Sequence, residues 1–509
     1  MTASLESRIL TYPVFWSVFI AAIAVRLLYH SFGVIDFWGD SFHNVYINWA
    51  TANNNWVYTD YMGREVVWMP FYRYLSGFFM YSFNSYSLTV AYVLNGLIGA
   101  TTCGLTASII EKYTSKITGY YSGLILAVLP WFLAYNHMHM PETLCALLLL
   151  LMVVVWDSEK YWWLLPIAFL GVLTRNEVTF SMIVFGVILL LQKNWRAAAP
   201  LAIGGSVGLV IWGWWCYNIT GDFFWWITER GIGSVWTNEF RSKYSSAQSV
   251  LYPAISVLIT FPFILIIFYK LKQISLQFLK QSKQFFVAVF VLFGTSWLAI
   301  FILQFKFLGY PDPKYYLITL PLTVIAFAII VYKTMRPIKT MRISLIISLM
   351  LLGAHIPVFK AMHLSGINIF QVGYYLKNHP LATERNIWND FTTAWYYSDI
   401  DPNRIYSSLQ LAPKLIREDA NYQAQVEQNM IDHDIRYLVA APASFTFVND
   451  IFHGLSTREP FVWRSFRFDP VYIFNPENEA EQSKYNFIEK QIVGNFGASF
   501  WRLTKLKEH

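Results

Sequence analysis

Long apolar runs alternate with short polar segments over most of the first 360 residues. A helix needs about 20 predominantly apolar residues to span a bilayer. Eleven runs come close to or meet this requirement, at 13–32, 87–110, 118–135, 142–156, 161–174, 178–192, 197–219, 251–270, 284–305, 315–332 and 343–360. The three runs between 142 and 192 are short, as expected of steep helices whose ends reach a water-filled cavity. The pattern predicts an α-helical polytopic membrane protein with about 11 transmembrane helices.

The first run continues to Tyr29 without a small-residue cleavage site, so we expect it to be a retained helix. The polar, aromatic segment 33–86 follows it. Within that segment, 66–83 mixes Arg73 and three tyrosines with apolar side chains, which is typical of a helix lying at the interface.

The distribution of basic residues indicates the orientation. If 66–83 does not cross and the N-terminus is cytoplasmic, the inner loops hold 13 basic residues in about 39 positions, and the outer loops hold 8 in about 103. Cytoplasmic loops are enriched in Lys and Arg in this way. If 66–83 crossed, every later loop would be inverted. We therefore predict that the whole of 33–86 is extracytoplasmic.

The composition changes from about residue 364. Apolar runs shorten, and turn signals such as Asp401-Pro402 appear. Strand-like runs occur at 404–407, 436–439, 471–474 and 500–503, with helix-like stretches at 409–418 and 422–432. The remaining length suffices for a small α/β domain. We predict a membrane module at 1–363 and an extracytoplasmic soluble α/β domain at 364–509.

Composition agrees with the membrane assignment, because 56% of residues are hydrophobic and 14% are charged, against about 25% charged in soluble domains. The net charge of +7 does not indicate nucleic acid, since the basic residues lie in short loops between apolar runs. Cys103, Cys145 and Cys216 all lie within apolar runs and have no metal-like spacing. This position indicates that they are small residues of the apolar core.

Four carboxylates fall at the outer ends of predicted helices, namely Asp36, Asp40, Glu142 and Glu177. Ionisable groups near membrane depth mark candidate functional sites. Each also has a structural explanation. Asp36 or Asp40 can be solvated or can cap a helix at 41–50, Glu142 can be a first-turn residue favoured by the dipole, and Glu177 can pair with Arg175.

Two further groups lie on the same predicted face. Lys314 stands at an outer helix start, where the dipole disfavours a cation, so an anionic partner such as phosphate is indicated. Snorkelling to the interface is the alternative. His137 and His139 are two residues apart, a spacing that suits a strand rather than a helical metal site.

A series of short motifs occurs in order along the chain. Arg26-Leu27 ends the first helix, Asp40 follows it, and then come Trp68-Met69-Pro70-Phe71-Tyr72, Pro141-Glu142-Thr143, Leu173-Thr174-Arg175-Asn176-Glu177, and Lys314-Tyr315 before a proline-containing helix. This series resembles the GT-C superfamily of polyprenyl-phosphate-sugar glycosyltransferases. It looks most like the branch with protein O-mannosyltransferases and lipid A aminoarabinose transferases.

The resemblance implies a GT-C-type enzyme of the plasma membrane. It implies inverting transfer of a sugar, a hexose or a pentose, from dolichyl or undecaprenyl phosphate to a protein, lipid or glycan acceptor at the outer face. Asp40 matches the family's first-loop aspartate and would be the general base. Ser41 replaces the usual acidic neighbour, so Asp36 and Glu142 join Asp40 as catalytic candidates. The substrate-binding candidates are Arg175, Glu177, Lys314, Tyr315, His139 and Arg73.

Some relatives use a divalent cation, Mg or Mn, and that possibility stays open. Trp225-Trp226 is followed by Ile227 rather than aspartate, which argues against en bloc transfer to asparagine. Two alternatives belong to other classes. One is a transporter or flippase of lipid-linked saccharides, although no two-fold hydropathy symmetry is present. The other is a non-catalytic subunit that binds saccharide through the tail.

Overall fold

A computed structural model describes residues 13–33, 36, 39–60, 66, 68–225, 255, 257–271, 314–365, 367–379, 385–398, 400–412, 421–440, 448–474 and 498–506. The chain forms two compact units. Residues 1–32 and 66–355 form the first, called the membrane unit. Residues 33–65 and 356–509 form the second, called the sheet unit. Segment 33–65 is therefore grouped with the C-terminal residues.

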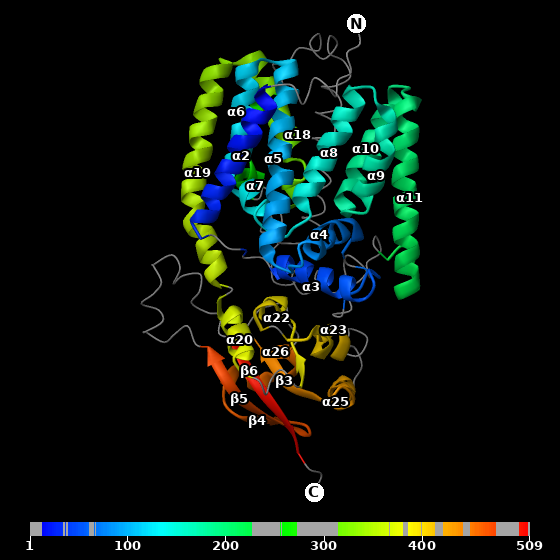
Figure 1. Ribbon diagram of the computed structural model, residues 1–509, viewed down its shortest axis with the longest axis vertical. Coiled ribbons are helices and arrows are strands. Elements are labelled where there is room, and N and C mark those ends of the chain that lie inside the picture. Colours follow the sequence, from blue (N-terminus) through cyan, green and yellow to red (C-terminus); the bar gives the residue numbers. More distant parts are fainter. Residues whose placement is uncertain are drawn as a thin grey trace. The chain divides into compact units, whose positions relative to one another are not determined.

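The membrane unit is a bundle of helices, in which α2, α5 and α6 pack side by side (Figure 1). Its elements are α2 (Pro13–Ser31), α4 (Pro70–Ser82), α5 (Leu88–Tyr113), α6 (Lys116–Val128), α7 (Pro130–Tyr135), α8 (Glu142–Asp157), η1 (Tyr161–Trp163), α9 (Leu164–Val172), α10 (Asn176–Leu191), α11 (Trp195–Thr220), α14 (Ile264–Leu271), α17 (Lys314–Leu317), α18 (Leu320–Thr334) and the first part of α19 (Pro337–Ser365).

Local chemistry sets several of these helix ends. Ser87 and Ser115 precede α5 and α6, and their hydroxyls accept hydrogen bonds from the amides of Thr89 and Thr118. Such caps satisfy amides that have no partner within the helix. The predicted run 118–135 is divided, because Pro130 has no amide hydrogen to continue the helix. It begins α7 instead.

Four of the described helices are long and apolar enough to cross a membrane, at Pro13–Ser31, Leu88–Tyr113, Trp195–Thr220 and Pro337–Lys360. Shorter apolar helices lie at Tyr161–Val172, Asn176–Leu191 and Leu320–Thr334. These agree with the predicted runs. The run 284–305 lies outside the described residues, as does much of 251–270. Helix α4 has 13 residues, and about 20 are needed to span.

The sheet unit contains one six-stranded mixed sheet in the order β2-β1-β3-β6-β5-β4. Its helices are α3 (Gly39–Asn53), α20 (Ile367–Lys377), α22 (Thr392–Ser398), α23 (Ser408–Leu411), α25 (Tyr422–Asp432) and α26 (Val448–Ile451), with η4 (Pro402–Arg404) and η5 (His453–Thr457). The strands are β1 (Asn386–Trp388), β2 (Ile405–Tyr406), β3 (Ile435–Ala440), β4 (Phe461–Trp463), β5 (Phe466–Phe474) and β6 (Ala498–Lys505).

Strands β2, β1 and β3 run parallel, and β3, β6, β5 and β4 pair antiparallel. The four strands predicted from sequence are confirmed as β2, β3, β5 and β6, and the predicted helix 422–432 is confirmed as α25. The core contains the fully buried Trp388 and Trp501. Trp501 lies on β6 beside Leu438 of β3, so the sheet is held by apolar packing as well as by its ladder.

Helix α3 packs against α22 within the sheet unit. The Tyr46 ring meets Trp395 edge-on at 4.7 Å between centroids, and Phe42 meets Tyr396 at 5.3 Å. Aromatic pairs in this geometry stabilise a contact beyond their buried area. The segment that follows α2 is therefore anchored on residues more than 300 positions later in the chain.

Candidate active site

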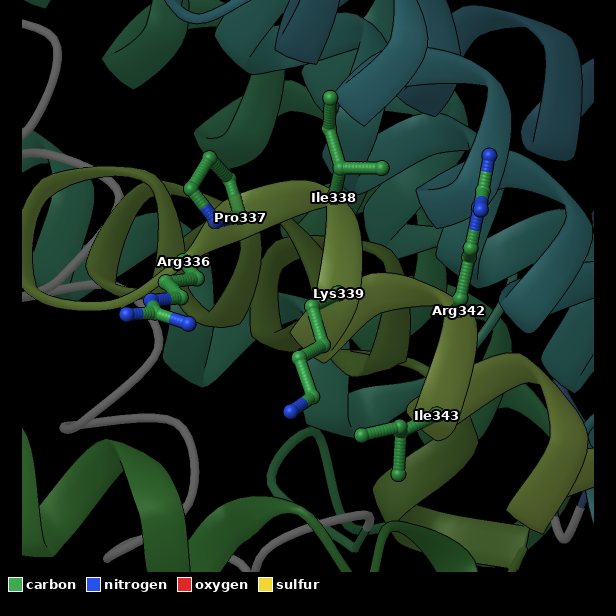
Figure 2. Close-up of a pocket in the computed structure, with 6 residues that line it drawn as sticks. All are labelled: Arg336, Pro337, Ile338, Lys339, Arg342 and Ile343. Atoms are coloured by element: carbon green, nitrogen blue, oxygen red, sulfur yellow. The ribbon is translucent and has the colours of Figure 1, made fainter.

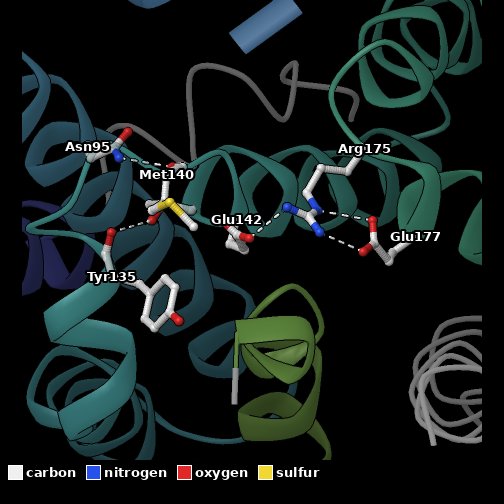
Figure 3. Close-up of polar contacts among 7 residues, drawn as sticks. Asn95, Tyr135, Met140, Glu142, Arg175 and Glu177 are labelled. Carbon is white, nitrogen blue, oxygen red and sulfur yellow. Dashed lines mark hydrogen bonds and ion pairs between the residues drawn. The ribbon is translucent and has the colours of Figure 1, made fainter. Parts of the chain in front are cut away.

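An arginine between two carboxylates lies at the centre of a polar cluster in the membrane unit (Figure 3). Arg175 Nε and Nη2 donate to the two oxygens of Glu177 at 3.0 and 2.7 Å, and Arg175 Nη1 donates to Glu142 Oε1 at 2.7 Å. The planar guanidinium suits such forked binding. Because Arg175 precedes α10 and Glu142 begins α8, the ion pairs join the starts of two helices.

Lys314 and Tyr315 adjoin this cluster. The Lys314 ammonium lies 5.3 Å from the centre of the Tyr315 ring, and the Arg175 guanidinium carbon lies 5.5 Å from the same ring. Both distances are typical of cation–π contacts. Lys314 is buried and lies within electrostatic reach of Glu142 and Glu177. Helix α17 thus adds a second cation to the Arg175 cluster.

The turn before Glu142 is held from α5. Asn95 Nδ2 donates to the carbonyl oxygens of Met138 and of Met140, the latter at 3.0 Å. The Thr143 hydroxyl donates to Tyr135 O at 3.4 Å, across the same turn. Main-chain carbonyls that are buried in an apolar bundle need such partners. Asn95 therefore fixes the direction in which α8 begins and so helps to place Glu142.

One oxygen of this cluster has no partner in the part of the chain that the structure describes. Glu142 is fully buried, and its Oε1 accepts from Arg175. Its Oε2 is buried and makes no hydrogen bond with any described residue. A buried, unsatisfied carboxylate oxygen is costly. It is therefore a candidate acceptor for a hydroxyl or amine of a substrate.

Arg73 and His139 form an adjoining layer. Arg73 lies on α4, with its guanidinium carbon 5.1 Å from the centre of the Trp68 ring. Tyr72 meets His139 at 5.3 Å between ring centroids. Burial lowers the pKa of His139 well below its usual range, and the charge of Arg73 adds to this effect. Burial and the charge of Arg73 therefore both disfavour the protonated form of His139.

A main-chain bond connects α4 to the site. The Phe71 amide donates to the carbonyl of Leu173 at 2.9 Å, so the first turn of α4 is held beside the segment that carries Arg175. The first amides of a helix have no partner within it. Leu173 satisfies one of them.

Asp36 and Asp40 lie in the sheet unit, at the start of α3. Asp36 is buried and accepts a hydrogen bond from the Ser41 hydroxyl. Asp40 is half-buried in the first turn of α3, where the helix dipole favours a carboxylate. Burial raises the pKa of Tyr397 of α22, and the nearby charge of Asp36 adds to that rise.

Sequence reasoning missed a buried pair formed by His43 of α3 and Asp60, which follows this helix in the chain. His43 Nε2 lies 2.7 Å from Asp60 Oδ2, and both side chains are buried. His43 is three residues after Asp40, a spacing that places two side chains on neighbouring parts of a helix surface. That spacing could have identified His43. Only the folded chain brings Asp60 back to α3.

The predicted site residues thus fall into two groups. Glu142, Arg175, Glu177, Lys314 and Tyr315 lie together in the membrane unit, with Arg73 and His139 adjoining, and Asp36 and Asp40 lie in the sheet unit. Asn95 was also missed, although a single Asn in a long apolar helix is a signal of a polar role. Among the described residues, no group of three or more His, Cys, Asp or Glu side chains is arranged to hold a metal ion.

Solved structures provide the comparisons. The chain is similar to ArnT from Cupriavidus metallidurans in its apo state, at 14% identity and TM-score 0.54 over 87% of this chain and 95% of the other. It is also similar to the same protein bound to undecaprenyl phosphate, at 11% identity and TM-score 0.55 over 96% and 98%.

A third similar structure is the Archaeoglobus fulgidus oligosaccharyltransferase in its apo form, at 10% identity and TM-score 0.50 over 84% of this chain and 69% of the other. No protein-family model and no curated protein sequence matches the chain. At identities this low, the structural similarity establishes a shared fold and nothing beyond it. The fold is therefore the part of the predicted resemblance that these structures establish.

Proposed function

Because the chain has the fold of the GT-C glycosyltransferases, we propose that it transfers a sugar from a polyprenyl phosphate to an acceptor at the outer face of the membrane. The observation that carries this proposal is the buried Arg175 cluster, in which Glu142 and Glu177 bind the guanidinium and Lys314 lies near both carboxylates. Ionisable groups in a membrane protein generally mark the path or site of a polar substrate. The similarity to a structure with bound undecaprenyl phosphate supports a lipid-phosphate donor.

Charge favours an anionic ligand. Arg73, Arg175 and Lys314 contribute three cations, whereas Glu142 and Glu177 contribute two carboxylates. All five side chains are at least largely buried. Arginine and lysine side chains form charge-assisted hydrogen bonds with phosphate oxygens. A phosphodiester-type lipid phosphate is therefore a suitable ligand for these side chains.

In the proposed reaction, Asp40 accepts the proton of the acceptor hydroxyl or amine. The freed oxygen or nitrogen attacks the anomeric carbon of the sugar on the face opposite the lipid phosphate, so the configuration inverts. The bond between the anomeric carbon and the phosphate oxygen breaks, and the lipid phosphate leaves with the bonding electrons. Lys314 and Arg175 stabilise its developing charge.

Glu142 would act on the sugar. Its Oε2 is buried and has no hydrogen-bond partner among the described residues, so it can accept a hydrogen bond from a ring hydroxyl. Glu177 would keep Arg175 in place through its forked contact. Tyr315 would cover both cations, as its ring lies within cation–π range of each.

The protein would be integral to the plasma membrane and multipass, with its N-terminus in the cytoplasm and its C-terminal residues outside. The acceptor would be a protein, a lipid or a glycan. The basic residues of the predicted inner loops support this orientation.

The test is the Asp40→Asn variant of the full-length protein in membrane vesicles. Vesicles are supplied with undecaprenyl-phosphate and dolichyl-phosphate sugars, and release of the free lipid phosphate is measured. We expect a loss of about 1000-fold in the rate, because the general base is removed. Asp432→Asn is the matched control, since Asp432 is exposed at the end of α25.

Full activity of Asp40→Asn would disprove the role of the base. Movement of intact lipid-linked sugar across the bilayer, with no cleavage by the wild type, would favour a transporter or flippase instead.

A further inference from the structure

The start of α19 and the residue just before it border a hollow in the membrane unit (Figure 2). It has a volume of about 590 Å³ and is lined by Arg336, Pro337, Ile338, Lys339, Arg342 and Ile343. Three of the six lining residues are basic, and no carboxylate is among the described residues that line it. The surface of the hollow is therefore largely aliphatic, and three basic side chains border it.

This hollow is distinct from the Arg175 cluster. Lys314 precedes α18, whereas Arg336 follows it. Helix α18 has 15 residues, so its two ends lie about 22 Å apart at the usual rise of an α-helix. That separation is on the order of the hydrocarbon thickness of a bilayer. The two polar regions thus belong to opposite ends of the membrane unit.

One of the basic side chains is held in place. Arg342 Nε donates to the hydroxyl of Tyr121 on α6 at 2.7 Å. Arg336 and Lys339 are exposed, and both lie in the first turn of α19 or just before it. A bias toward basic residues in inner loops explains their presence. It does not explain why they line a hollow or why one of them is fixed from a neighbouring helix.

The helix face beyond the hollow is apolar and exposed. Ile343, Ile346 and Met350 of α19 are 47%, 57% and 69% exposed, and only 17% of the most apolar window of this helix is buried. In a membrane-spanning helix such a face contacts acyl chains. Along α19, the basic residues come first and the exposed apolar face follows them. A phospholipid has the same order, with its charged headgroup followed by its acyl chains.

We propose that this hollow binds the headgroup of an anionic phospholipid, with an acyl chain along the exposed face of α19. Arg336 and Lys339 would contact the phosphate, and Arg342 would provide a fixed donor. Basic residues at the membrane surface attract anionic lipids in this way. The inference does not depend on the proposed transferase activity.

The test uses full-length protein in detergent and native mass spectrometry, with phosphatidylglycerol and phosphatidylcholine offered together. We expect wild type to retain phosphatidylglycerol preferentially, and the Arg336→Gln/Lys339→Gln variant to lose at least about tenfold in its retention. The matched control is Arg196→Gln/Lys333→Gln. It also removes two exposed cations from predicted inner loops, but neither of them lines the hollow.

Tyr121→Phe tests the site without changing any charge. It removes the hydroxyl that accepts from Arg342, and we expect a several-fold weaker preference for phosphatidylglycerol. Equal lipid retention in all variants would overturn the proposal, as would an equal loss in the Arg196→Gln/Lys333→Gln control. A thermal stabilisation by inorganic phosphate alone that matched that by phosphatidylglycerol would also overturn it, because the ligand would then be a free anion.

Discussion

At the scale of single residues, Arg175 has a geometry that no other cation can reproduce. It uses three nitrogens to bind Glu142 and Glu177 from helices α8 and α10. Lysine presents a single point charge and lacks the planar fork. The identity of this residue, and not only its charge, therefore matters for both the fold and the proposed site.

We expect Arg175→Lys to lower the free energy of unfolding by about 2 kcal/mol, because one buried carboxylate loses its partner. Donor affinity should fall about tenfold or more, since the remaining cation is misplaced. Thermal unfolding in detergent and a donor-binding assay measure the two effects.

The control is Arg436→Lys. Arg436 pairs with Asp434 at 2.5 Å, but both side chains are at least 40% exposed. Exposed pairs contribute at most about 1 kcal/mol. An equal loss of stability in the two variants would contradict a special role for Arg175.

The buried His137 should make the stability of the folded protein depend on pH. Its Nε2 lies 2.9 Å from His30 Nδ1, and burial lowers the pKa of His137 to about 4, with the charges of His30 and Arg26 contributing further. An unfolded histidine has a pKa near 6.5. Above pH 6.5 neither state is protonated. As the pH falls from 6.5 toward 4, the unfolded state gains a proton that the folded state does not.

Stability should therefore fall over this window, by up to about 1.4 kcal/mol per pH unit. His137→Gln should show a shallower fall. Unfolding temperatures in detergent at pH 7.5 and 5.0 measure the difference. Identical pH slopes for wild type and variant would show that His137 does not titrate in this way.

At the scale of elements, α5 is long and apolar enough to cross a membrane, and it also holds the turn before α8. Asn95 lies in a helix that is otherwise largely apolar, and its side-chain amide serves two carbonyls of the turn before α8. A side chain of α5 therefore holds the turn from which α8 begins. The position of Glu142 depends on a residue 47 positions earlier in the chain.

We expect Asn95→Ala to reduce stability by about 2 kcal/mol, because two buried carbonyls lose a donor. The turnover number should fall more than the Michaelis constant changes, since Glu142 is displaced rather than removed. Asn378→Ala removes a comparable side-chain bond, to Tyr374 O at 3.0 Å, from an exposed helix end. It should have little effect on either quantity.

Most helices could be predicted because their apolar runs are long, as for α5 and α11, and the interface mixture at 66–83 indicated a helix that proved to be short. Strands β1 and β4 were missed, and each has only three residues, too few to show an alternating pattern. Strand β2 is shorter still, but it lies within the longer strand-like run 404–407. The Arg175–Glu177 contact could be anticipated from proximity in the sequence. The Asn95 and Asp60 contacts could not, since only the tertiary fold brings those residues to their partners.

At the scale of the whole molecule, the boundary between the units does not follow the chain. The segment 33–65, which carries Asp36 and Asp40, is grouped with residues 356–509. Its contact with the later residues is aromatic, through Tyr46 and Trp395. The C-terminal residues therefore help to hold the helix on which the proposed base lies.

We expect Trp395→Ala to lower the rate of sugar transfer at least tenfold, although Trp395 is far in sequence from every predicted site residue. Its loss removes both the edge-on contact with Tyr46 and a large buried surface. Release of lipid phosphate from membrane vesicles measures the rate.

Trp162→Ala is the control, because Trp162 is 80% exposed. A full rate in Trp395→Ala, with the protein folded, would mean that α3 keeps its conformation without α22.

The bond between the Phe71 amide and the Leu173 carbonyl joins two segments of the site through the main chain alone. Such a bond makes no demand on either side chain, because every residue has a carbonyl and every residue except proline has the amide hydrogen. Substitutions can therefore accumulate at both positions while α4 stays attached. The contact between α4 and residue 173 can therefore be retained while the sequence at both positions changes. Proline at position 71 would remove it, because proline has no amide hydrogen.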